Sequence, residues 1–258
     1  MRSVRGTFLT ASAVAALTFP GSPAEASTSS AARTPSALST AFSVGGDIRD
    51  RVLPLRLHRT ARAAASVDGR GRGGSYQVTA RGRTERVKVY VSRRFASWDP
   101  GVNRAWAQAF ADMPHGTELS KLTVFLAPFS EITSSSVCGA QADSCYDPND
   151  GTIYLSGETP ADGADMKQVA MHEYGHHVAA FRSNIPWDSV NWGPKYWSSA
   201  VGVCSLAKQK LMWPTDAWNH YEDHPGEIWA ETYRLVASSA EGISADPWEI
   251  LNPRWNPI

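Results

Sequence analysis

Apolar and polar residues are patterned so as to predict a small β-sheet in the middle of the chain. The stretch RVKVYVS (residues 86–92) alternates at period two, as a half-buried strand does. LTVFLAP (122–128) is a continuous apolar run suited to a central strand, and the residues between these two runs (102–113) have helical spacing. DPNDG (147–151) is a strong turn signal, and TIYLS (152–156) after it is a further candidate strand.

Two further helices are predicted in the second half of the chain. DMKQVAMHEYGHHVAAF (165–181) has the pattern of a buried helix capped near Asp162 or Asp165. HPGEIWAETYRLVASS (224–239) is a second, largely apolar helix with Pro225 in its first turn. The order of elements therefore predicts an α+β fold, a small mixed β-sheet packed on one side by helices.

Composition adds limits on the partners of the protein. The chain has 258 residues, 42% of them hydrophobic, which suits one globular domain with a loosely attached N-terminal region. Lysine plus arginine (25) equals aspartate plus glutamate (25), so no global field draws the protein to nucleic acid or an anionic membrane. We expect a monomer as the default state, and we expect partners to be recognised by a local site.

The N-terminus has the features of a signal peptide. Arg2 and Arg5 precede an apolar run (8–19), and Ala24-Glu25-Ala26 is a small-x-small cleavage site, so residues 1–26 are expected to be removed. The alternative is an uncleaved membrane anchor, but the run is too short to span the bilayer. We therefore expect a secreted, extracellular protein without stable membrane insertion.

Two segments separate this signal from the predicted domain. Residues 27–45 are rich in serine, threonine, alanine and proline, a composition that predicts a disordered linker. Residues 46–84 form an arginine-rich N-terminal or pro-like region with a glycine-rich stretch and a possible strand at 76–80. A short pro-region, a strand hairpin and an irregular edge of the domain all remain open for it. The main domain is expected at residues 85–258.

Three cysteines fit an exported protein, in which disulfides persist. Cys138 and Cys145 are the favoured pair, because they flank a short polar loop. Cys204 lies in an apolar helical pattern and is expected to be a buried free thiol, although pairing of Cys138 with Cys204 stays open. Zinc binding by the cysteines is the weakest interpretation, because their spacing contains no CxxC pair.

The strongest chemical signal is HEYGH in the first long helix. His172 and His176 are four residues apart, so a helix places both imidazoles on one face, where they can bind the same ion. Catalytic zinc lowers the pKa of a bound water toward about 7, and Glu173 beside it is the candidate general base. The alternative is a pair of surface histidines, but the uncharged flanks favour a buried helix. His177 is expected to face elsewhere and to be structural.

A catalytic zinc site needs a third protein ligand. Glu227 and Glu231 lie four residues apart on the second long helix, and their mutual repulsion is explained if Glu227 binds the metal while Glu231 accepts the free N–H of a ligand histidine. A solvated acidic face is the simpler alternative, although the helix is largely apolar. His224 is the rival third ligand, less rigidly placed at the helix start.

HEYGH followed by EIWAE resembles the gluzincin metallopeptidases, and EIWAETYRLVAS is similar to the corresponding helix in the catalytic-domain family of anthrax lethal factor. The resemblance covers about a third of the chain and implies a zincin-like fold with one Zn2+ ion. It implies that TIYLS is the edge strand to which an extended peptide adds. It also implies a tyrosine before the glutamate helix that stabilises the oxyanion, and Tyr221 lies in that region; an ordinary packed tyrosine is the alternative.

These features predict a secreted zinc-dependent peptidase that acts on a peptide or protein substrate. One alternative is a zinc-containing binding module without turnover, and another is a latent enzyme whose residues 27–84 block the cleft. The second half of the chain is rich in tryptophan, which we expect mostly in the core or in cleft walls, with an aromatic carbohydrate site as the alternative. These tryptophans are Trp187, Trp192, Trp197, Trp213, Trp218 and Trp229.

Overall fold

The computed structural model describes residues 71–134, 137–140, 142–158, 165–249 and 251–255. Every described residue belongs to a single compact unit of the chain. The predicted signal peptide (1–26), the linker (27–45) and the first part of the arginine-rich region lie outside the described residues.

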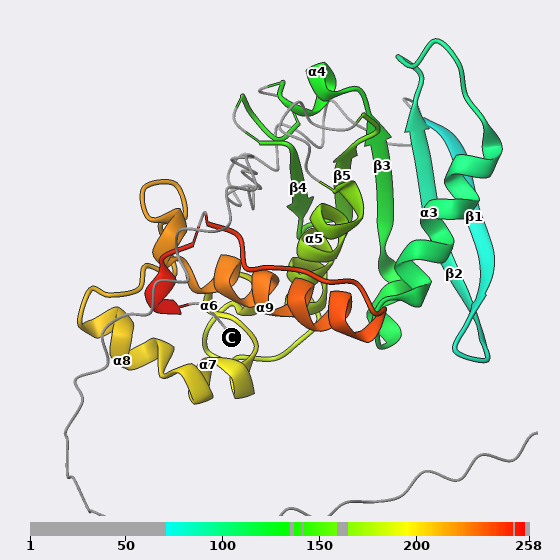
Figure 1. Cartoon of the computed structure of the whole chain (residues 1–258). Helices are drawn as coiled ribbons and strands as arrows, with labels where there is room; N and C mark the ends of the chain where they lie inside the picture. The colour runs from blue at the N-terminus through cyan, green and yellow to red at the C-terminus, as the bar shows by residue number, and fades with distance from the viewer. Residues whose placement is uncertain (1–70, 135–136, 141, 159–164, 250, 256–258) are drawn as a thin grey trace, which may run out of the picture. The chain divides into compact units, whose positions relative to one another are not determined.

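A five-stranded mixed sheet forms the centre of the described chain, in the order β1-β2-β3-β5-β4 (Figure 1). The middle pairs β2–β3 and β3–β5 are parallel, whereas β1–β2 and β4–β5 are antiparallel. The strands are β1 (Gly71–Ala80), β2 (Arg83–Ser92), β3 (Thr123–Ala127), β4 (Ser144–Asp147) and β5 (Thr152–Ser156). The prediction of a small mixed sheet in an α+β fold is confirmed, and LTVFLAP is its central strand.

Helices account for most of the remaining described residues. The longer ones are α3 (Pro100–Asp112), α5 (Met166–Ala180) and α9 (Pro225–Ala240), with short α4 (Phe129–Ile132), α6 (Ser189–Trp192), α7 (Lys195–Val201) and α8 (Val203–Lys208). Three 3₁₀ turns are η1 (Thr117–Lys121), η2 (Tyr221–Asp223) and η3 (Pro253–Trp255). The predicted helices over 102–113, 165–181 and 224–239 correspond to α3, α5 and α9.

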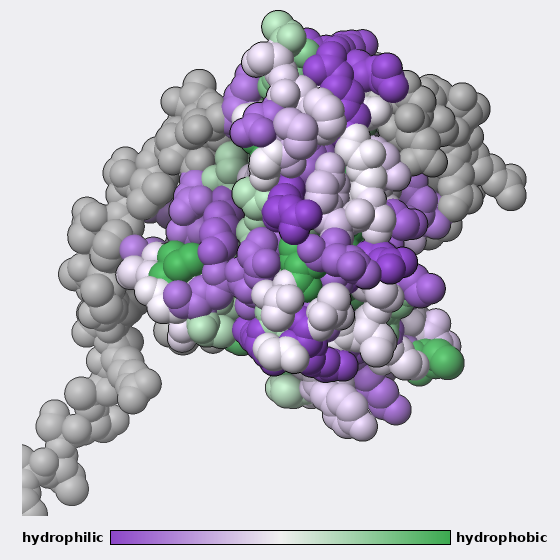
Figure 2. All heavy atoms as spheres, turned by 90° about the vertical axis from the view of Figure 1, so that its right-hand side faces the viewer, coloured by the Kyte–Doolittle hydropathy of each residue, from purple (hydrophilic) through white to green (hydrophobic). Residues whose placement is uncertain are grey.

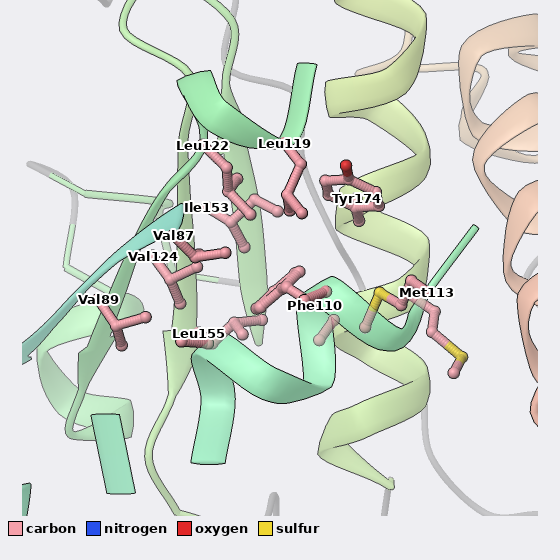
Figure 3. Close-up of a cluster of buried hydrophobic side chains, with 14 of the residues drawn as sticks. Val87, Val89, Phe110, Met113, Leu119, Leu122, Val124, Ile153, Leu155 and Tyr174 are labelled. Atoms are coloured by element: carbon pink, nitrogen blue, oxygen red, sulfur yellow. The ribbon is translucent and has the colours of Figure 1, made fainter. Parts of the chain in front are cut away.

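Successive side chains of a strand point to opposite faces of the sheet, and different elements cover the two faces. In β3, Val124 and Leu126 join the larger core with α3 and α5, where Phe110 and Tyr174 fill the space against the sheet (Figure 3). Phe125 points to the other face, where a smaller cluster packs beneath α4 and the loop before β4. The three long helices thus lie on one side of the sheet, and α5, which carries HEYGH, packs against β4 and β5.

Two features of the sheet bear on the sequence expectations. Residues 71–92 form a hairpin, β1–β2, so the sheet begins at Gly71, inside the arginine-rich region, where a strand hairpin was one of the open alternatives and the possible strand at 76–80 is part of β1. TIYLS was expected at the edge, which is wrong: β5 lies between β3 and β4. Among the described residues the edge strand on this side of the sheet is β4. It was not predicted, because its four residues overlap the cysteine-flanked polar loop and the DPNDG turn and carry too short a strand pattern of their own.

Cys138 and Cys145 form a disulfide between the loop and β4, as predicted. Cys204 is free, but the expectation that it is buried is wrong, because it is exposed. The helix that carries it, α8, is short and turns Val203 toward a small apolar cluster, which leaves the next residue on the solvent side.

The tryptophans of the second half are less buried than a core would require. Trp187 and Trp218 are exposed, at 45% and 68%, whereas Trp192, Trp197 and Trp229 are partly buried against the apolar clusters.

No helix among the described residues is both long and apolar enough to cross a membrane. The face at the β1, β2 and α3 end is mainly hydrophilic, with only scattered apolar side chains (Figure 2).

The disulfide gives a first test of the fold. Replacing Cys138 and Cys145 together by alanine should lower the free energy of unfolding by about 2.5 kcal/mol, the chain-entropy value for so short a loop. The measurement is urea unfolding under non-reducing conditions. Cys204→Ala, at an exposed thiol, is the matched control and should leave the midpoint unchanged. Equal midpoints for the double variant and the parent would contradict the pairing.

Candidate metal centre

The helix α5 presents the HEYGH residues from the middle of the domain. Asp165 is its N-cap and accepts a hydrogen bond from the Lys167 amide at 2.8 Å, which satisfies one of the free N–H groups of the first turn. From Val169 to Ala179 every residue of the helix is buried. A helix apolar on all sides is typical of a domain centre, so the side chains of His172, Glu173 and His176 are held in fixed surroundings.

The helix α9 supplies the second half of the site and crosses α5 at very close range. Pro225 occupies its first turn, as predicted. A Cβ atom at Gly175 would lie 2.8 Å from Ala230 Cα and 3.0 Å from its carbonyl oxygen, so only glycine fits there. The indole N–H of Trp229 donates to the Gly175 carbonyl at 2.8 Å. This close approach brings the first turns of α9 to the histidines of α5.

Three side chains converge where the helices meet. Glu227 Oε2 lies 3.4 Å from His172 Nε2 and 3.1 Å from His176 Nε2. One ligand atom from each residue falls within 4.8 Å of the others, and all three side chains are buried. The predicted ligand set is therefore brought together, and it could hold a metal ion.

Glu231 lies behind this group, one turn further along α9. Its Oε2 is 3.6 Å from His172 Nδ1, on the opposite side of the ring from Glu227. Arg234 donates to both carboxylate oxygens of Glu231 at 2.7 Å, and the Trp248 amide donates to Oε1 at 2.9 Å. The predicted position of Glu231 beside a ligand histidine is what the structure has, and the carboxylate is held there by three donors.

Both glutamates are ionised at neutral pH despite their burial. Burial acts to raise the pKa of Glu227, but the charge of His176 and the hydrogen bonds from His172 and His176 outweigh it, so the pKa lies well below its usual value. Burial likewise acts to raise the pKa of Glu231, and the interactions with Arg234 and His172 hold it at about 2. The site thus offers an anionic oxygen to a cation.

Glu173 contacts the edge strand β4. The Ser144 hydroxyl, on β4, donates a short hydrogen bond to Glu173 Oε1. Ser144 directly precedes the disulfide-bonded Cys145, so the strand that orients this carboxylate is covalently tied to the loop beside it. Neither Ser144 nor Gly175 was identified from the sequence, because each acts through a contact with a residue remote in the chain.

The remaining candidates fall outside the ligand group. His224 is buried at the N-cap of α9 with Nδ1 3.8 Å from Glu227 Oε1, so it flanks Glu227 and lies outside the group that could hold a metal ion. His177 faces away, as predicted: Nδ1 lies 3.2 Å from the Tyr146 hydroxyl and Nε2 lies 2.9 Å from the Glu118 carbonyl oxygen. Burial lowers the pKa of His177 to about 4, so it is neutral at pH 7.

Tyr221 is carried by η2, immediately before α9. Its ring packs against a cluster that includes Met212 and Ile228. Its hydroxyl is buried and has no hydrogen-bond partner among the described residues. A buried hydroxyl without a partner is uncommon and costs about 1–3 kcal/mol. Its role as oxyanion donor stays a prediction.

No protein-family model, curated protein or solved structure matches this chain.

The close approach at Gly175 can be tested by one methyl group. Gly175→Ala places a carbon against the Ala230 backbone, which cannot move aside as a side chain can, and should cost about 1–3 kcal/mol of stability. Because the helices must separate, metal affinity should fall as well. The control is Gly74→Ala, since a Cβ there meets nothing within 4 Å. Thermal unfolding with metal and without it measures both effects; equal metal affinity in Gly175→Ala would show that the spacing is unimportant.

Proposed function

We propose that this protein is a secreted zinc-dependent peptidase. The observation that carries the proposal is the distance of Glu227 Oε2 from the Nε2 atoms of His172 and His176. Ligands bound tetrahedrally at 2.0–2.1 Å would be about 3.3 Å apart, and the two nitrogen-to-oxygen distances are 3.4 and 3.1 Å. Both distances are close to that value, and all three ligand atoms lie within 4.8 Å of one another.

The donor types favour zinc over harder cations. Two imidazoles and one carboxylate suit zinc and its transition-metal neighbours, whereas calcium and magnesium prefer oxygen ligands throughout. Glu231 facing His172 Nδ1 leaves Nε2 as the nitrogen directed at the metal position. Three protein ligands leave one tetrahedral position for water or substrate, which is typical of a catalytic rather than a structural zinc site.

The chain's own residues supply the proton transfers of peptide hydrolysis. Zinc at this site would act as a Lewis acid toward water and the peptide carbonyl. Glu173 takes the proton of the attacking water on its carboxylate and passes it to the leaving amine as the C–N bond breaks. Ser144 holds that carboxylate in one orientation through its hydrogen bond to Oε1. The buried Tyr221 hydroxyl is the candidate donor to the developing oxyanion.

An extended peptide is the substrate class that the sheet favours. In the described part of the chain β4 has a strand partner on one side only, namely β5. Addition of a peptide to a free strand edge is a common recognition mode. Because Ser144 of β4 contacts Glu173, a peptide paired with this strand would run past the general base. In this proposal the peptide adds to β4 and not, as expected from the sequence, to TIYLS.

The general base gives the first test of function. Glu173→Gln keeps the size of the side chain but cannot accept a proton, so zinc content should stay near one per chain while peptide hydrolysis falls at least about 100-fold. Zinc content is measured by elemental analysis, and peptide hydrolysis is measured on a peptide library. Removing the metal with a chelator should abolish the parent's activity. Stoichiometric zinc without turnover in the parent would favour a zinc-containing binding module instead.

Ser144 gives a second test within the same mechanism. Ser144→Ala removes a hydrogen bond to a charged group, so kcat should fall about 10-fold with KM and zinc content unchanged. Ser144→Thr, which keeps the hydroxyl, should recover most of the rate. Ser199→Ala is the control, because that hydroxyl is exposed on α7 and bonds only its own helix. An alanine variant as fast as the parent would remove Ser144 from the mechanism.

A further inference from the structure

The chain reverses direction after α9 and runs back along it (Figure 1). Gly242, with φ of 70°, makes the turn, and the Ile243 amide donates to the Ser238 carbonyl at 2.8 Å. Further along, Arg234 donates to the Asp246 carbonyl, which ties the returning segment to the middle of α9. The segment therefore reaches the side of the metal centre where Glu231 lies.

Trp248, in this returning segment, touches the metal ligand His172. The two rings are stacked, with centroids 5.1 Å apart and planes inclined by 26°. Arg234 lies over the same indole at 4.2 Å from the ring centroid. The Trp248 amide also donates to Glu231, the carboxylate that faces His172 Nδ1. One residue thus contacts both the ligand ring and the group that orients it.

We infer that Trp248 is a positioning residue of the metal centre, which fixes the ring of His172 through the stack while its amide fixes Glu231. The inference rests on the proposed zinc site. An imidazole can rotate about its bond to Cβ, and rotation would move Nε2 away from the position set by His176 and Glu227. A flat indole against the ring removes that freedom before the metal binds, and affinity rises because less ordering is needed on binding.

The contacts of the indole explain why it stays in place. Trp248 is only partly buried and packs against the main core from its edge. Arg234, which is itself fully buried, gains from the electron-rich ring face as well as from Glu231. Gln168 of α5 accepts a further hydrogen bond from Arg234, so both helices and the returning segment share one guanidinium. The ring is therefore anchored by side chains that do not touch the metal position themselves.

The test compares two apolar replacements in the purified full chain, with zinc affinity measured by competition against a chromophoric chelator. Trp248→Leu removes the aromatic face but keeps the amide, and should raise the zinc dissociation constant about 10-fold or more, the range for contacts that orient a ligand. Trp248→Phe keeps a stacking ring and should stay within about threefold of the parent. Trp187→Leu is the control, an exposed tryptophan, and should bind as the parent does.

Cobalt provides a second measurement that does not require the leucine variant to fold. Co2+ quenches nearby tryptophan emission, so the quenching should be smaller in Trp248→Phe than in the parent. Equal quenching in the two proteins, or parent-like zinc affinity in Trp248→Leu, would overturn the inference. A parent that binds zinc but cleaves no peptide overturns the peptidase proposal alone, whereas a parent that binds no zinc overturns both.

Discussion

The approach of α5 and α9 at Gly175 is the constraint on which the site depends. With any side chain there, the Ala230 backbone would have to withdraw, because a Cβ would come within 2.8 Å of Ala230 Cα. Glu227 is one turn before Ala230 on α9, and His172 and His176 flank Gly175 on α5, so the same contact sets the positions of all three side chains. Neither half of the site is useful alone, because each helix supplies an incomplete set of donors.

Burial of so much charge at one helix crossing is costly unless each group has a partner. Glu231 is compensated by Arg234 and by a backbone amide, and Glu227 by the imidazoles it faces. These partners come from both long helices and from the returning C-terminal segment, which makes the polar network a property of the whole domain. A metal cation would add the remaining positive charge at the position where two histidines and Glu227 meet.

The sequence determined the parts of the fold that have local signals. Period-two and continuous apolar runs located β2 and β3, Pro225 marked the start of α9, and four-residue spacing placed the histidines and glutamates correctly. The parts it could not supply are contacts between remote segments. Ser144 reaches Glu173 across 29 positions and Gly175 meets Ala230 across the helix crossing, and no spacing rule links such residues. The edge position assigned to TIYLS was wrong for the same reason, because strand order is set by pairing rather than by pattern.

The contacts between remote segments also explain how the site can be ordered before any ion binds. The disulfide and β4 hold Ser144 against Glu173, the Gly175 crossing holds His172, His176 and Glu227 together, and Trp248 with Arg234 holds the far side of His172. Each support comes from a different segment, so the positions of the ligands are fixed by the folded domain and not by the helix that carries them. Preorganisation of this kind strengthens binding because little freedom is left to lose. The five residues HEYGH therefore belong to a group that could hold a metal ion only together with the residues that surround them.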